Sequence, residues 1–407
     1  MSDYKGIAYL QRKLATKRSR VLLRYAFYEQ KQRAKDFGIS TPKGLEWFQS
    51  VNGWCTKAVD GLADRLQFDG FENDNFEMQE IFNINNPDII FDSSILGALI
   101  SSCDFFYISR DENGDPRIQV IDGANATGII DDQTNLLTEG YAVLSRDDLD
   151  QPLTYAYFQR GETWVYETGK MDPIAHESTG ADYAALVPVI YKPDARRPFG
   201  HSRISRACMD IALSAMRTVK RSEIAAEFYS FPQKYATGLS QDAEILDSWK
   251  ATMSAMLSFT RDDEGNAPTL GQFQQQSMQP HVEQLKAFAS MFAGETGLTM
   301  DDLGFNTANP SSAEAIKASH EALRLAASKA QRCFGSSFVN AGYIAACIRD
   351  NFAYERSEVF KTKVEWKPVF EPDAAALSSI GDGIIKLNQA MPDYIDEKRM
   401  HRLTGIE

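Results

Sequence analysis

Histidine and cysteine, from which many catalytic and metal sites are built, are scarce in this sequence. Only five of the 407 residues are histidine and five are cysteine. No histidine lies four positions from another or in a zinc-binding helix pattern, and no cysteine pair has metal-ligand spacing. The cysteines are therefore expected to be reduced and buried. We assign no catalytic residue, no metal and no cofactor.

A phosphate-binding loop and a membrane-spanning segment are also missing. Gly169-Lys170 lacks the upstream glycine and the following serine or threonine that cradle a phosphate. No stretch approaches the roughly 20 apolar residues that span a bilayer. The N-terminus is basic and has a helical pattern instead of an apolar run, so it does not read as a signal peptide. The sequence predicts no membrane partner.

Net positive charge is absent as well. The formal net charge is −13 and the pI is near 5.0. A protein that binds DNA tightly is usually basic, because its lysines and arginines release counterions from the phosphates. The acidity therefore argues against an ordinary DNA-binding protein, although many cytoplasmic proteins are equally acidic.

Two pairs of acidic residues follow strand-like runs. Asp131-Asp132 and Asp147-Asp148 have the carboxylates with which a nuclease holds a divalent cation. Paired acids in such places are more often plain turn residues. We favour the turn interpretation and keep a metal-dependent nuclease as the alternative.

The first two hundred residues predict an α/β domain. Helical periodicity covers 10–35, 45–66 and 92–103. Alternation typical of strands follows at 106–109, 117–121, 141–144, 153–158, 163–166 and 187–190. Residues 112–115 are a hairpin turn signal between the first two of these strands.

The first predicted helix has a basic face. Its members are Lys13, Lys17, Arg18, Arg20 and Arg24. Such a face is either solvated or in contact with a partner, and we favour solvation.

The middle of the chain predicts two long helices with a mixed insert between them. The first helix runs from a cap at Ser202 to about residue 229, spans about 40 Å, and stops before Pro232. The second starts at Pro280 and stops at Gly297. The insert predicts a strand at 233–238, a helix at 242–258, a polar turn at 261–266 and an edge strand at 270–277.

A loop and a third helix follow. Residues 301–310 are rich in turn formers and have no periodicity. Residues 311–314 form a capping box, with serine at the N-cap and Glu314 three positions on. The helix beyond it is rich in alanine, which permits close packing against a neighbour.

The chain resembles the portal proteins of tailed bacteriophages, in the branch with a long stem and a short clip. The matching residues keep the family's order and spacing over about a third of the chain. They are Arg197-Pro198-Phe199-Gly200-His201-Ser202-Arg203-Ile204, Phe231-Pro232-Gln233-Lys234-Tyr235, Gly271-Gln272-Phe273, Gln279-Pro280-His281, Phe292-Ala293-Gly294-Glu295-Thr296-Gly297-Leu298 and Asn309-Pro310-Ser311-Ser312-Ala313-Glu314-Ala315-Ile316.

This resemblance implies an α+β chain with the portal fold. Its parts are an α/β wing, a two-helix stem, a small α/β clip, a tunnel loop and a helical C-terminal crown. The implied boundaries are wing 1–200, first stem helix 201–230, clip 231–280, second stem helix 281–300, tunnel loop 301–311, tunnel helix and wing return 312–371, and start of the crown 372–407. The crown is either short or truncated after Glu407.

The resemblance also implies a structural role in the virion, with assembly in the host cytoplasm. The chain would form a homo-oligomeric ring, usually a dodecamer, at one capsid vertex. Double-stranded DNA would pass through it during packaging and ejection. The implied partners are the terminase large subunit, a head-completion adaptor, and the major capsid and scaffolding proteins. An acidic lumen fits such a channel, because it repels the DNA backbone and keeps the duplex mobile.

Two groups of site residues follow from this layout. The DNA-facing candidates of the tunnel loop and the helix behind it are Asn306, Thr307, Asn309, Ser311 and Lys317. The clip candidates for contact with the motor or adaptor are Trp249, Lys250, Asp262, Asp263 and Glu264. For the loop the alternative is an ordinary polar surface loop. For Trp249 the alternative is a place in the core of the clip, which we slightly favour. A different capsid-associated scaffold remains a third class of function.

Overall fold

The computed structural model describes most of the chain and divides it into two units. The described residues are 4–37, 41, 43–230, 234–237, 265, 267, 269–272, 277–305, 318–359, 361–370, 374–392 and 394–404. Unit 1 comprises Met1–Gln32, Gly53–Met209 and Ala293–Glu407, and unit 2 comprises Arg33–Asn52 and Asp210–Phe292. The chain mixes helices and antiparallel sheets, so the predicted α+β class is confirmed.

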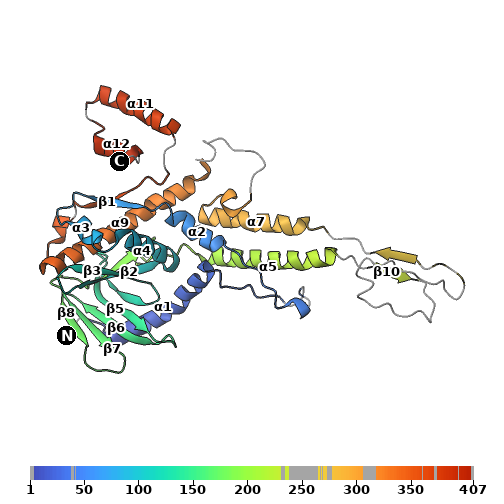
Figure 1. The fold of residues 1–407 in the computed structure, drawn as a ribbon, viewed down its shortest axis with the longest axis horizontal. Helices are drawn as coiled ribbons and strands as arrows, with labels where there is room; N and C mark the ends of the chain where they lie inside the picture. The colour runs from blue at the N-terminus through green and yellow to red at the C-terminus, as the bar shows by residue number, and fades with distance from the viewer. Residues whose placement is uncertain are drawn as a thin grey trace. The chain divides into compact units, whose positions relative to one another are not determined.

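A five-stranded antiparallel sheet of unit 1 is covered by the first helix (Figure 1). Its strands lie in the order β4 (Ala126–Ile130), β5 (Leu137–Arg146), β6 (Pro152–Gln159), β7 (Glu162–Glu167) and β8 (Ala175–Ser178). Helix α1 (Ile7–Tyr28) places Leu10 and Leu14, four residues apart on one face, against Tyr141 of β5. The buried carboxylate of Glu139 accepts hydrogen bonds from the backbone N–H groups of residues 5 and 6, at 2.9 and 2.7 Å, and so satisfies donors at the start of α1.

A three-stranded antiparallel sheet forms the centre of unit 1. Its order is β3 (Pro116–Ile121), β2 (Cys103–Arg110) and β9 (Leu186–Ile190). Helices α4 (Pro87–Ser101) and α9 (Glu321–Asp350) pack on it. Successive side chains of β2 point to opposite faces. Phe106 lies near Phe338 of α9, with ring centroids 6.0 Å apart, whereas Phe105 lies beneath the ammonium group of Lys17 in α1.

Shorter elements complete unit 1. They are α2 (Trp54–Ala63), β1 (Phe68–Glu72), α3 (Met78–Asn83), the 3₁₀ turn η2 (Asp301–Leu303), α10 (Arg356–Val359), β12 (Lys363–Trp366), α11 (Ala374–Ala390) and α12 (Glu397–Thr404). Strands β1 and β12, far apart in the sequence, pair antiparallel. They bring Phe68 and Trp366 into the aromatic cluster around Phe338.

Unit 2 contains an N-terminal arm, residues 33–52, together with most of two long helices. The helices are α5 (Arg206–Ser230) and α7 (Gln279–Thr296), and the described strands are β10 (Lys234–Thr237) and β11 (Thr269–Gln272), which pair antiparallel. The arm includes the 3₁₀ turn η1 (Lys43–Leu45). Within unit 2, Thr218 of α5 donates a hydrogen bond to Gln284 of α7 at 3.1 Å.

Several predicted elements are confirmed, but the boundaries of three predicted helices are wrong, the first of them because α1 spans Ile7–Tyr28 and not 10–35. Helix α7 begins beside Pro280 and ends before Gly297, whose φ of 71° is the left-handed stop that the sequence predicts. The predicted helix at 45–66 begins only at Trp54, because residues 45–52 belong to the extended arm. The predicted helix at 92–103 instead begins at Pro87 and ends at Ser101, and Cys103 already lies in β2.

The predicted N-cap of the first long helix is also wrong. Helix α5 begins at Arg206, and the hydroxyl of Ser205 accepts the Cys208 N–H at 3.1 Å. Ser202 lies in the preceding turn, where its hydroxyl donates to the Ile100 carbonyl at 2.6 Å and accepts the Ile204 N–H at 3.0 Å. Either serine has a hydroxyl that could cap the helix. Ser205 is the N-cap, because Ser202 lies in the turn that precedes the helix.

Candidate functional site

The ten site residues expected from the sequence lie outside the described residues. This holds for the loop candidates Asn306, Thr307, Asn309, Ser311 and Lys317 and for the clip candidates Trp249, Lys250, Asp262, Asp263 and Glu264. The capping box at 311–314 and the predicted helix at 242–258 lie outside them too. These assignments stay predictions.

Only the entry end of the predicted tunnel loop, residues 301–305, is described, and it contacts His320, which follows the undescribed stretch 306–317. On the entry side, the Asp302 carboxylate accepts the Thr299 N–H at 2.8 Å and the Thr299 hydroxyl at 2.9 Å. On the exit side, His320 is the N-cap residue of α9, and its Nδ1 lies 3.8 Å from Oδ2 of Asp302. Phe305 packs edge-on against Trp54 of α2, with ring centroids 6.4 Å apart. The base of the loop is therefore fixed to unit 1 on both sides.

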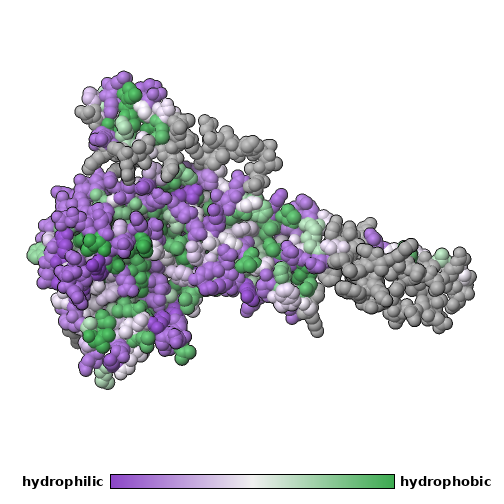
Figure 2. Space-filling view, viewed as in Figure 1, coloured by the Kyte–Doolittle hydropathy of each residue, from purple (hydrophilic) through white to green (hydrophobic). Residues whose placement is uncertain are grey.

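The long helices expose much of their surface in the single chain. Of α7, Ala289, Phe292, Ala293 and Thr296 are buried, whereas Val282 and Met291 are exposed. On the face seen in Figure 2, hydrophobic side chains lie among hydrophilic ones along α5 and α7. A contiguous patch of exposed apolar side chains marks a surface that another chain covers, whereas single exposed apolar side chains are ordinary.

The charged residues that α5 and α7 expose are mostly acidic. The exposed acids are Asp210, Glu223, Glu227, Glu283 and Glu295, and the exposed bases are Arg206 and Lys286. Lys220 of α5 is not among the exposed bases. It is buried, and its ammonium lies 3.2 Å from Oδ2 of Asp36 in the arm.

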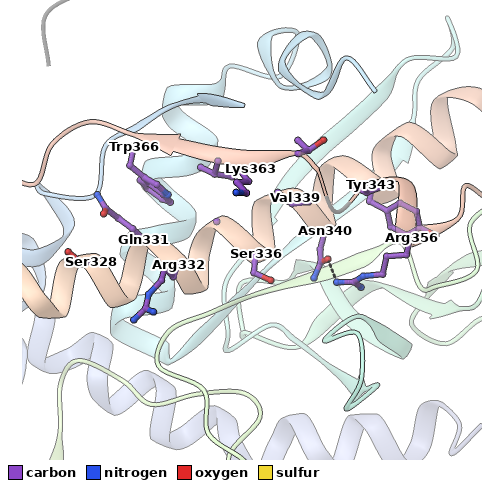
Figure 3. A pocket seen from close by; sticks show the side chains of 14 residues that line it. Ser328, Gln331, Arg332, Ser336, Val339, Asn340, Tyr343, Arg356, Lys363 and Trp366 are labelled. Carbon is purple, nitrogen blue, oxygen red and sulfur yellow. Dashed lines mark hydrogen bonds between the residues drawn. The ribbon is translucent and has the colours of Figure 1, made fainter. Parts of the chain in front are cut away.

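A pocket of about 430 Å³ lies between α9 and β12 (Figure 3). Its polar lining includes Arg332 and Asn340 of α9, Arg356 of α10 and Lys363 of β12. The Arg356 guanidinium donates to the Asn340 side-chain oxygen at 2.8 Å and to the Thr134 carbonyl at 2.8 Å. Burial lowers the pKa of Arg356 from its usual value.

A larger cavity, of about 760 Å³, lies on another flank of α9 and shares Arg332, Ser336 and Asn340 with the first pocket. We call this cavity the α9 groove. Its other walls come from β9 and the segment after it, residues 188–193. Among the described residues that line it, the charged ones are all basic. The sequence analysis missed this site, because residues from four separate stretches of chain form it.

The basic face predicted for the first helix is largely not solvated, so the favoured interpretation is wrong. Lys13 donates to the Gly128 carbonyl at 2.6 Å. The Lys17 ammonium lies 5.1 and 5.7 Å from the ring centroids of Phe105 and Phe199. Arg18 pairs with Asp150 at 2.6 Å, and Arg24 donates to the Ile204 carbonyl at 3.3 Å, which leaves Arg20 exposed. These contacts hold α1 to the sheets.

Near Lys17, a carboxylate is fully enclosed. Asp104 is 2% exposed, and its Oδ1 accepts the Ser101 hydroxyl and the Gly123 N–H, both at 2.9 Å. Burial, with the nearby charge of Asp122, raises the pKa of Asp104 to about 8. Burial lowers the pKa of Lys17 to about 8 as well.

The two acidic pairs act as turn residues. Asp131 Oδ1 accepts the Gln133 N–H at 2.9 Å, and Asp147 Oδ1 accepts the N–H groups of Leu149 and Gln151 at 3.0 and 2.7 Å. The turns lie at opposite ends of β5, which at about 3.3 Å per residue separates them by about 30 Å. They therefore do not form one site. Among the described residues, no cluster of three or more metal-ligating side chains was found, and no described helix is long and apolar enough to cross a membrane.

Comparison with known proteins finds portal proteins. One relative, the portal protein of Mycobacterium phage L5, is 22% identical over 397 residues, which cover 90% of this chain and 80% of the relative. The portal protein of Mycobacterium phage D29 is 22% identical over 396 residues, which cover 90% and 81%. The predicted resemblance to phage portal proteins is confirmed. No model of a known family matches the chain.

Solved structures with a similar arrangement come from gene transfer agent particles. A chain of the neck of the native particle, computed with C12 symmetry, has a TM-score of 0.47 and 14% identity, and the match covers 86% of this chain and 89% of that one. A chain of the native virion has a TM-score of 0.44 and 12% identity and covers 88% and 90%. The portal relatives support a structural role for this chain.

Proposed function

We propose that copies of this chain form a portal ring at one capsid vertex, through which viral DNA is packaged and later ejected. The observation that carries the proposal is the match to portal proteins over 90% of the chain. The uncovered surface of α7 supports self-association, because neighbouring copies would cover it. The ring would also present a docking platform for the terminase and the head-completion adaptor, through the residues between β10 and β11.

In this proposal the ring guides DNA without gripping it. The exposed acids of α5 and α7 and the net charge of −13 oppose tight binding of phosphates. The tunnel loop, with Asn306, Thr307, Asn309 and Ser311, would touch the duplex with short uncharged side chains, and Lys317 would lie behind it. The contact between Asp302 and His320 at the base of the loop supports this arrangement, because a fixed base limits how far the loop can swing.

The loop assignment is tested by deleting residues 306–309. We expect rings that still assemble, because the fixed base at Asp302 and His320 is retained, but that package DNA poorly. Assembly is scored by imaging purified rings, and packaging by DNA protected from nuclease in an in vitro reaction. The matched control replaces Asn306, Thr307 and Asn309 with alanine, since residue 308 is alanine already, and keeps the loop length. Normal packaging by the deletion variant would contradict the assignment.

A metal-dependent nuclease is the weaker candidate. The acidic pairs that suggested it are used in two separate turns about 30 Å apart. No specific observation on the described residues favours it.

A further inference from the structure

The α9 groove has an apolar floor and a basic rim. The apolar residues that form this floor come from two segments. Ile190 and Pro193 belong to β9 and the segment after it, and Leu325, Ala326 and Ala330 belong to α9. Leu325 is 48% exposed, although it lines a cavity of about 760 Å³. Exposed leucine in a concave apolar wall indicates a site for an inserted side chain.

The rim has charge of one sign. Lys192, Lys329 and Arg332 are exposed there, and they form no ion pair with any described residue. None of the described residues that line the cavity is a carboxylate, in a chain whose net charge is −13. The groove therefore fits a segment that combines an apolar side chain with carboxylates.

The chain itself has such a segment, the turn between β5 and β6. We call residues 147–151 the acidic turn. Leu149 at its tip is 81% exposed, and Asp148 beside it is exposed too. Asp147 accepts two backbone N–H groups within the turn, and Asp150 pairs with Arg18. These bonds fix the turn before any partner arrives, so docking it costs little conformational entropy.

We propose that the acidic turn of one copy docks in the α9 groove of the next copy. Leu149 lies against the apolar floor, and Asp148 faces the basic rim. The turn does not fill the groove of its own chain, because Leu149 is exposed and is not among the lining residues. A contact between two different surfaces on identical copies is head-to-tail and closes into a ring when the rotation allows it. This inference rests on the proposed ring.

DNA is a poorer occupant of the groove. Phosphates need cations but gain nothing from the floor of Ile190, Leu325 and Ala326. A segment with an apolar side chain beside carboxylates would contact both the apolar floor and the basic rim.

The test uses the cysteine that the groove already contains. Cys333 lines it and is partly exposed, whereas the other four cysteines are buried. In the variant Leu149→Cys, a short bismaleimide should join the new thiol to Cys333 of a neighbouring copy and give a ladder of dimers, trimers and larger species in a denaturing gel. Met171→Cys, at another turn and 97% exposed, is the matched control and should give no ladder. Leu149→Cys with Cys333→Ser should give none either.

The same samples are imaged before crosslinking, so that two failures are distinguishable. Rings without a ladder, or with the same ladder from Met171→Cys, would overturn the docking and leave the proposed ring intact. A protein that forms no rings would overturn both. A charge exchange checks the rim independently: Lys329→Glu should reduce the fraction of protein in rings, and Asp148→Lys in the same chain should restore it. If Lys329→Glu reduces the fraction of protein in rings and Asp148→Lys does not restore it, the proposed pairing of Asp148 with the basic rim is contradicted.

Discussion

At the residue scale, Asp104 and Lys17 show charged groups that the fold takes out of water. Asp104 sits so close to α4 that a Cβ at Gly97 would lie 1.7 Å from its Oδ2, so only glycine fits there. Its carboxyl is surrounded by Ser101, Gly123 and the neighbouring charge of Asp122. Burial of this kind makes the ionised carboxylate costly, which is why its pKa rises.

The raised pKa of Asp104 predicts a pH dependence of stability. A carboxyl group whose pKa is about 8 when folded and about 3.8 when unfolded binds its proton more tightly in the folded state. The stability it contributes is therefore complete below about pH 4 and is lost as pH rises to about 8. We expect the free energy of unfolding of the native protein to fall, relative to Asp104→Asn, over that range. Asparagine keeps the acceptor for Ser101 and Gly123.

Urea unfolding of both proteins at a series of pH values measures this difference. The contribution of Lys17 to stability changes with pH in the opposite direction, because its pKa is lowered in the folded state and stability is lost as pH falls from about 10.5 to about 8. Measurements below pH 7 therefore isolate the effect of Asp104. A difference between the two proteins that is constant between pH 4 and 7 would contradict the assignment.

Sequence periodicity does not reveal such residues. It correctly ended α7 at Gly297. It placed Lys17 on a solvated face, and that is wrong. A pattern of apolar residues shows which side of a helix is buried in the largest core, but not whether a second element covers the opposite side.

At the element scale, the arm of unit 2 shows how tertiary contacts override local propensity. Residues 45–52 have a helical pattern, yet they form only a turn and irregular structure, and Ser50 among them contacts α5. The Ser50 hydroxyl donates to the Met216 carbonyl at 2.5 Å, and the ring of Phe37 lies 4.9 and 5.4 Å from the guanidinium carbons of Arg217 and Arg221. Asp36 accepts a hydrogen bond from Thr41 and pairs with Lys220, and these contacts lower its pKa.

The pair between Asp36 and Lys220 predicts how the arm is held. Asp36→Ala leaves the buried Lys220 ammonium without its carboxylate, which is strongly unfavourable. The arm should then leave α5, and limited proteolysis should cut residues 33–52 faster. Glu46→Ala, which removes an exposed acid of the same arm, is the control and should change little. Adding Lys220→Met to Asp36→Ala should restore resistance, and equal cleavage of all variants would contradict the pairing.

The elements around the candidate site were predicted unevenly. The strands of the first two hundred residues alternate clearly, so β2, β3, β5, β6, β7 and β9 were expected. The strands β1, β4, β8 and β12 were not expected. The α9 groove was not foreseen either, since its walls meet only after the chain folds.

At the scale of the whole molecule, the account depends on assembly. A single chain leaves Val282 and Met291 of α7, Trp47 of the arm, and Leu149 of the acidic turn exposed. Neighbouring copies would cover such side chains and gain roughly 25 cal/mol for each Å² of apolar surface removed from water. Where the acidic surface of α5 and α7 faced passing DNA in the proposed ring, it would repel the phosphates and favour mobility of the duplex.

Single-particle imaging of the purified full chain tests the central claim most directly. The account predicts closed rings, of about a dozen copies by analogy with portal proteins, with a central hole wide enough for a DNA duplex and residues 306–311 of each copy at the wall of that hole. A compact monomer under all conditions would contradict it, and so would a ring in which residues 306–311 lie on the outer rim.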